Sequence, residues 1–106
     1  MIAVTELEFT IILDILAAYV PDGEVWAFGS RYRGTAKPYS DLDLAIIGNE
    51  KLSARLLGDI RDAFEESNLP FRVDALDWNS LSKEFQAIIK SGYEVIYSPK
   101  VEGRTA

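Results

Sequence analysis

The sequence predicts a small α/β (α+β) domain, in which a mixed sheet of about four strands carries helices packed on it. Three segments show apolar residues at helical spacing, four short apolar runs have the length of strands, and the two types alternate along the chain. A chain of 106 residues is long enough for one hydrophobic core. We therefore expect one domain over residues 1–98 and a flexible polar tail at 99–106.

The first helix is predicted to begin after Thr5. Thr5 and Glu8 are three residues apart and have the pattern of a capping box, and apolar residues recur at helical spacing as far as Tyr19. A Pro-Asp-Gly turn at residues 21–23 ends this helix. Residues 25–28 are apolar and predict a short buried strand.

A bend and a second strand follow. Gly29-Ser30 forms the bend, and residues 31–36 fit either a single helical turn or a loop. The second strand is predicted at residues 41–47, where Gly-Asn at 48–49 closes it.

The next helix and strand occupy the middle of the chain. Apolar residues at helical spacing predict a helix from about residue 52 to residue 66. Gly58 lies inside it at a cost to helix propensity that the sequence does not explain. A third strand is predicted at residues 71–76.

The last helix and strand end the domain. A helix is predicted around residues 81–89, with Ser82 as its N-cap and Gly92 directly after its end. The final strand is predicted at residues 93–97, with Val95 facing inward.

Composition excludes several classes of function. A net charge of −6 argues against a nucleic-acid partner, because that binding depends on neutralisation of phosphate by Lys and Arg. No apolar run reaches the roughly 18 residues of a membrane span, and no secretory signal is evident, so we expect a cytoplasmic protein. Without cysteine or histidine, Ser-His and Cys-His catalysis and most transition-metal sites are excluded.

Asp41 and Asp43 stand at the head of an otherwise apolar strand. Side chains two apart on a strand share a face, so the two carboxylates should lie about 6–7 Å apart. At an effective dielectric constant of about 20 they would repel by roughly 3 kcal/mol. A divalent cation would turn this repulsion into attraction, and oxygen ligands alone favour Mg²⁺ or Mn²⁺.

Gly29 and Ser30 end the first strand and can cradle a phosphate. Glycine permits close approach of the backbone, exposed N–H groups and the serine hydroxyl donate, and Arg31 and Arg33 add positive charge. A turn glycine followed by a capping serine is the alternative reading of this pair.

A third carboxylate is needed to deprotonate an attacking hydroxyl in two-metal chemistry. Asp74 is the candidate, because it lies in an apolar strand, whereas an acid on an edge strand is the alternative reading. Asp77 lies three residues further on, should face the other way, and is interpreted as a strand-end or turn residue.

Two segments resemble a known family. Residues 29–47 read GSRYRGTAKPYSDLDLAII, which resembles the signature of the polymerase-beta-like nucleotidyltransferase superfamily: Gly-Ser, a spacer, then Asp-hydrophobic-Asp. Residues 72–97 read RVDALDWNSLSKEFQAIIKSGYEVIY, which is similar to the C-terminal half of the minimal nucleotidyltransferases. The resemblance implies the polymerase-beta-like fold and metal binding and catalysis by three acids: Asp41, Asp43 and Asp74. It implies binding of a nucleotide triphosphate by a second set: Gly29, Ser30, Arg31 and Arg33.

The same resemblance implies an activity and a partner. Minimal nucleotidyltransferases are often antitoxins of HEPN-domain ribonuclease toxins, and some transfer AMP from ATP to a tyrosine of the toxin with Mg²⁺. Two alternatives stay open: a module that neutralises its toxin by contact alone, and nucleotidyl transfer to a small molecule. The apparent lack of a second domain for an acceptor counts against the small molecule, and the intact acids count against contact alone.

Overall fold

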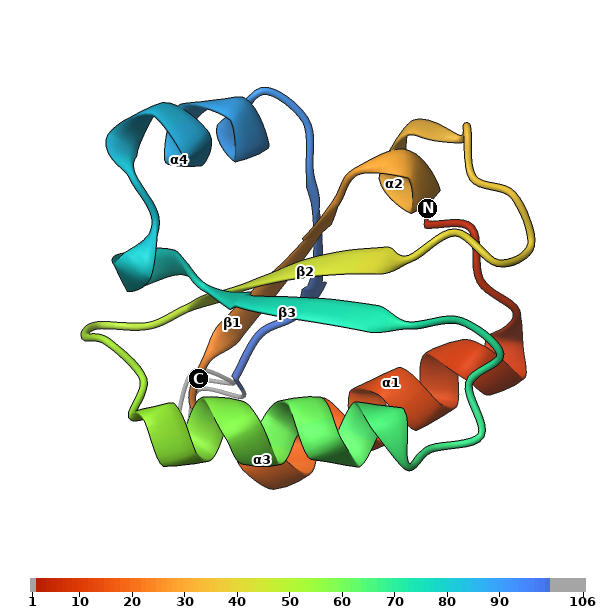
Figure 1. Cartoon of the computed structure of the whole chain (residues 1–106), viewed down its shortest axis with the longest axis horizontal. Coiled ribbons are helices and arrows are strands. Elements are labelled where there is room, and N and C mark those ends of the chain that lie inside the picture. Colours follow the sequence, from red (N-terminus) through yellow and green to blue (C-terminus); the bar gives the residue numbers. More distant parts are fainter. Residues whose placement is uncertain (1, 100–106) are drawn as a thin grey trace, which may run out of the picture.

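The computed structural model describes residues 2–99, which form a single four-stranded sheet with helices on both faces (Figure 1). The strands lie in the order β3-β2-β1-β4. β1 runs antiparallel to both β2 and β4, whereas β2 and β3 run parallel. The strand bounds are β1 Glu24–Phe28, β2 Leu42–Ile47, β3 Val73–Asp77 and β4 Glu94–Tyr97. The predicted mixed sheet is therefore confirmed.

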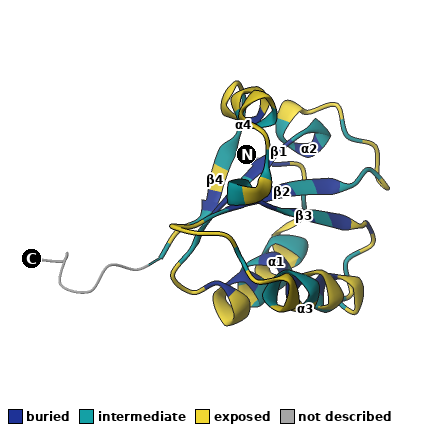
Figure 2. Ribbon diagram, turned by 60° about the vertical axis from the view of Figure 1, so that its left-hand side comes forward, coloured by how far each residue is buried: buried dark blue, intermediate teal, exposed yellow. Residues whose placement is uncertain are grey.

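Helices α1 (Glu6–Tyr19) and α3 (Ala54–Glu65) cover one face of the sheet, the lower face in Figure 1. Alternate strand residues point toward them and form the main core, and the outer faces of both helices are exposed (Figure 2). The side chains at the centre of this core are fully buried: Ile12, Leu16, Val25, Leu42, Leu44 and Ile60.

Helices α2 (Ser30–Arg33) and α4 (Lys83–Lys90) and the 3₁₀ turn η1 (Trp78–Ser80) lie on the other side. A smaller apolar cluster holds α4 there, around the buried Phe28, Ala45 and Ile89. Trp26 stacks on Tyr93 with ring centroids 3.9 Å apart. Because α4 is only 8 residues long, it covers only part of this face.

The predicted starts of the first and last helices are confirmed by their caps. The Thr5 hydroxyl accepts a hydrogen bond from the Glu8 N–H, and the Glu8 carboxylate accepts one from the Thr5 N–H. Ser82 caps α4 by accepting from the Phe85 N–H. Within residues 2–99 no helix has both the length and the apolar character needed to cross a membrane.

Two strand boundaries and the orientation of one side chain differ from the prediction. β2 begins at Leu42 and not at Asp41, since its ladder with β3 begins where Leu42 faces Val73. β3 begins at Val73 and not at residue 71. Val95 was predicted to face inward, yet it is 46% exposed and Ile96 is buried, because the β1–β4 ladder shifts register between Val25 and Trp26. Apart from Pro99, the predicted tail at residues 99–106 lies outside the described residues.

We expect Gly58→Ala to stabilise the protein by about 0.5–1 kcal/mol, because alanine is the better helix former. An added Cβ at this α3 position meets no atom within 4 Å. Thermal or urea denaturation measures the change, which corresponds to a rise in Tm of a few degrees.

Gly34→Ala is the matched control. An added Cβ at Gly34 also meets nothing within 4 Å, but the residue has φ +79°, where L side chains are strained. This variant should lose about 1 kcal/mol of stability. If both variants shifted stability in the same direction, backbone conformation would not be what separates these glycines.

Candidate active site

The parallel pairing of β2 with β3 places Asp43 directly beside Asp74. Neighbouring strands lie about 4.8 Å apart, so the two half-buried carboxylates are close. Leu42 and Leu44 belong to the main core, so alternation turns Asp43 to the opposite face, which α2 and α4 share. The structure thus brings together two of the three predicted acids on the partly open face of the sheet.

The pKa of Asp43 is raised from its ordinary 3.8 to about 6. Burial is the largest cause, followed by the negative charges of Asp74 and then Asp41. All three acids therefore contribute to one region of negative potential. A carboxylate whose pKa is raised by burial and by neighbouring acids is typical of sites that bind cations or move protons.

Gly29 lies against the Asp43 carboxylate. Its backbone has φ 79° and ψ −157°, and a Cβ at this position would collide with Asp43 Oδ2. Only glycine tolerates both this positive φ and the lack of space for a Cβ. Glycine at position 29 therefore allows the Gly29-Ser30 turn to approach Asp43 this closely. Ser30 then begins α2, and its hydroxyl makes no hydrogen bond to any protein group among residues 2–99.

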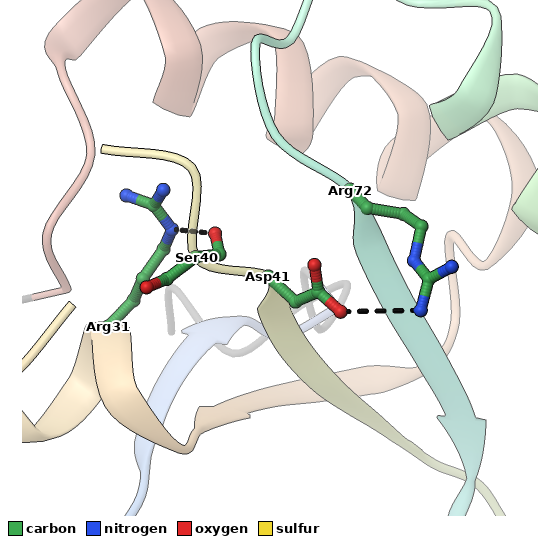
Figure 3. A network of polar contacts seen from close by, with 4 residues as sticks. All are labelled: Arg31, Ser40, Asp41 and Arg72. Carbon is green, nitrogen blue, oxygen red and sulfur yellow. Dashed lines mark hydrogen bonds and ion pairs between the residues drawn. The ribbon is translucent and has the colours of Figure 1, made fainter. Parts of the chain in front are cut away.

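Asp41 directly precedes β2, and its carboxylate pairs with Arg72 (Figure 3). The Arg72 Nη2 to Asp41 Oδ2 distance is 3.4 Å, and the Arg72 side chain is 79% exposed. An exposed pair of this length contributes little to stability, about 0–1 kcal/mol. Sequence reasoning missed Arg72, although its place two residues before Asp74 put it on the same side of an extended chain.

The three acids fit a hard divalent cation by their chemistry. All the donors are carboxylate oxygens, and the raised pKa of Asp43 shows the repulsion that a cation would relieve. In the part of the chain that the structure describes, no three acidic side chains already surround one point. The Asp41 carboxylate is held by Arg72 in this arrangement.

The two arginines of α2 have different environments. Arg33 is exposed, and its guanidinium has no protein partner among residues 2–99. Arg31 is buried, and main-chain carbonyl oxygens accept four hydrogen bonds from its guanidinium. This placement differs from the expectation that Arg31 assists in holding phosphate, because four of its five N–H donors are already used.

Asp77 lies outside this group of acids, in agreement with its interpretation as a strand-end residue. It ends β3 and is buried, where its carboxylate accepts from the Leu52 N–H, the Asn79 N–H and the Ser80 hydroxyl. These bonds join the start of α3 to η1.

A family model described as "Polymerase beta, Nucleotidyltransferase" matches residues 12–102, which include all the residues of this site. The chain belongs to this family. It is also 53% identical over 89 residues to the "Probable protein adenylyltransferase MntA" of Haemophilus influenzae, an alignment that covers 84% of this chain and 78% of the relative. This nucleotidyltransferase is thus a homologue of a probable protein adenylyltransferase.

Solved structures share the fold. A toxin–antitoxin structure with AMP-PNP matches with a TM-score of 0.73 at 22% identity, covering 87% of this chain and 74% of the other. A complex of a tri-AMPylated Shewanella oneidensis HEPN toxin with an MNT antitoxin matches with a TM-score of 0.67 at 20% identity, covering 88% and 71%. At these identities the matches establish the polymerase-beta-like fold of the nucleotidyltransferase.

We expect Asp43→Asn to stabilise the metal-free nucleotidyltransferase above pH 6. The native pKa of about 6 exceeds the ordinary 3.8, so the native state holds the Asp43 proton more tightly than the unfolded state. Ionising Asp43 therefore costs stability as pH rises from about 4 to about 6. Because solvent screens the charge of this half-exposed side chain, the loss of stability should be only about 1 kcal/mol.

Chemical denaturation of both proteins at pH 4 and pH 7 measures this effect. The advantage of Asp43→Asn should be near zero at pH 4 and largest at pH 7. Asp59→Asn, a change of an exposed acid on α3, is the charge-matched control and should show no such pH dependence. An equal advantage of Asp43→Asn at both pH values would contradict the raised pKa.

Proposed function

We propose that this nucleotidyltransferase transfers AMP from ATP to a hydroxyl group of a partner protein, a HEPN-domain toxin, and so acts as its antitoxin. The observation that carries the proposal is the packing of Gly29 against Asp43, which in turn lies beside Asp74. It combines a turn suited to a triphosphate with acids suited to a cation and to a proton. The relative from Haemophilus influenzae, named as an adenylyltransferase of proteins, supports a protein acceptor.

In this proposal Gly29 and Ser30 hold the triphosphate. The backbone of Gly29 carries no side chain that would block an approaching phosphate, and the Ser30 hydroxyl has no competing protein partner in the described chain. Arg33 adds an exposed guanidinium one turn further along α2. Arg31 contributes no phosphate contact.

Asp41, Asp43 and Asp74 are the proposed ligands of Mg²⁺, with Mn²⁺ as a substitute. A bound cation would neutralise charge on the triphosphate and on the leaving pyrophosphate. Because Asp43 must lose its proton to act as a ligand, its raised pKa makes metal affinity fall below about pH 6.

The transfer step follows from these positions. The oxygen of the acceptor hydroxyl attacks the α-phosphorus of ATP and forms a new O–P bond, while the bond from that phosphorus to the bridging oxygen breaks and pyrophosphate leaves. Asp74 accepts the hydroxyl proton, since it lies beside Asp43 on the edge strand β3. In each transfer the acceptor protein gains one AMP and one pyrophosphate is released.

The partner is proposed from the comparisons. Two of the matched structures are toxin–antitoxin complexes, and one contains an AMPylated HEPN toxin. We also propose a cytoplasmic location, because ATP is available there.

Intact-mass spectrometry tests this function. After incubation of a HEPN-domain toxin with this chain, ATP and Mg²⁺, we expect the toxin to gain the mass of one or more AMP units. Asp41→Asn and Asp43→Asn should abolish the gain, because each removes a proposed metal ligand, while the exposed Asp59→Asn should retain it.

Two results would contradict the proposal. If Asp43→Asn still transferred AMP, Asp43 would not be a required ligand of the metal. No gain with any nucleoside triphosphate, although the two proteins co-purify, would favour neutralisation by contact alone; without co-purification, a small-molecule acceptor would be favoured.

Metal binding can be tested without an acceptor. Excess Mg²⁺ should stabilise the wild-type chain by about 1–3 kcal/mol at ten to a hundred times its dissociation constant. Asp43→Asn should gain much less, and the gain of the wild type should shrink at pH 5. A stabilisation of equal size in both proteins would place the cation elsewhere.

A further inference from the structure

Arg31 is a buried cation with an unusual set of partners. It is 5% exposed and projects from α2, next to Ser30. Its guanidinium donates to four main-chain carbonyl oxygens: Ala3 O at 2.7 Å, Ser40 O at 2.9 Å, Pro38 O at 2.9 Å and Lys37 O at 3.4 Å.

No carboxylate in the described part of the chain balances this charge. Among residues 2–99 Arg31 forms no ion pair, and the ring of Phe71 lies 3.9 Å from its guanidinium carbon. Burial of an unpaired charge is costly unless hydrogen bonds and a π face replace the lost water. An apolar side chain could fill the same space without that cost. We therefore infer that position 31 needs the several N–H donors that a guanidinium presents in one plane.

The fork holds a segment that has little other support. Residues 35–41 contain neither helix nor strand. Within them, the Ser40 N–H donates to Lys37 O at 3.0 Å and the Lys37 N–H donates to the Ser40 hydroxyl at 2.8 Å. Three of the four carbonyls that Arg31 binds belong to this segment.

The segment ends at a proposed metal ligand. The Ser40 carbonyl belongs to the peptide unit that leads directly into Asp41, so fixing it fixes the main chain of Asp41. Figure 3 shows the resulting chain of contacts, from Arg31 to Ser40 and from Asp41 to Arg72. A second anchor joins Arg31 to the N-terminal segment, since the Ala3 N–H donates to Arg31 O at 2.9 Å.

We propose that Arg31 is a positioning residue of the nucleotidyl-transfer site. Through Ser40 it fixes Asp41 relative to the Gly29-Ser30 turn, and it does not touch the nucleotide. The inference rests on the proposed function, because it concerns the geometry of the proposed metal ligands. A lysine would keep the charge but offers one nitrogen, which cannot reach all four carbonyls.

The test compares Arg31→Lys with wild type in Mn²⁺ affinity, measured from free Mn²⁺ by electron paramagnetic resonance, and in transfer kinetics. We expect Mn²⁺ affinity to fall by about 10–100-fold, as for other residues that orient metal ligands. The kcat at a fixed low metal concentration should fall with it, while KM for ATP changes little. Trypsin should cleave faster after the exposed Arg33, because the following segment loses its anchor.

Ile12→Val controls for stability. Ile12 is fully buried in α1, on the other side of the sheet, so this change should cost about 1 kcal/mol without altering Mn²⁺ affinity. A comparable loss of affinity in Ile12→Val would show that lower stability alone explains Arg31→Lys, and would overturn the proposal.

Two other results overturn it. One is a folded Arg31→Lys with wild-type Mn²⁺ affinity. The other is a rise in KM for ATP with unchanged Mn²⁺ affinity, which would make Arg31 a nucleotide contact. A wild-type chain that neither binds Mn²⁺ nor transfers AMP would instead refute the proposed function.

Ser40→Ala keeps the proposal testable if Arg31→Lys does not fold. It removes only the hydroxyl that accepts from the Lys37 N–H, and so loosens the same segment. We expect a several-fold loss of Mn²⁺ affinity with Tm nearly unchanged. Unchanged affinity in Ser40→Ala would then overturn the proposal.

Discussion

The register between β2 and β3 is the constraint on which this structure depends. It sets Asp43 beside Asp74, where burial and mutual repulsion raise the pKa of Asp43. The same register buries Leu42 and Leu44 in the main core, and each such side chain contributes about 1.5–3 kcal/mol. A slip by one residue would turn the acids into the core and the leucines out of it. Hydrophobic burial on one face therefore holds together carboxylates that repel on the other.

A second constraint fixes the turn that faces the acids. The antiparallel pairing of β1 with β2 brings Phe28 opposite Asp43, so the next residue of the chain must pass beside the carboxylate. Gly29 makes that passage possible, since any Cβ would occupy the space of Asp43 Oδ2. The turn and the acids are thus one structural unit, although the sequence separates them by a segment without regular structure.

The sequence predicted most of what depends on pattern. The starts of the first and last helices and the existence of the four strands follow from capping residues and from periodicity, whereas the pairing of Asp43 with Asp74 depends on the register between two strands. The hydrogen-bond partners of Arg31 could not be predicted, because they are main-chain carbonyls, which every residue carries. Val95 was misplaced because a register shift between two strands leaves no mark on a four-residue strand. Pattern reports the periodicity of one element, whereas these features depend on contacts between elements.

Asp41 is supported from two sides by interactions of different strength. Its main chain follows Ser40, which the buried fork of Arg31 holds, whereas its carboxylate pairs with the exposed Arg72. Hydrogen bonds from a buried charged donor are worth about 1.5–3 kcal/mol each, and the exposed pair is worth about 0–1 kcal/mol. A cation that approached Asp41 would therefore displace Arg72 at little cost and leave the backbone where it is. The arrangement gives Asp41, a proposed metal ligand, a fixed main-chain position and an exchangeable partner for its carboxylate.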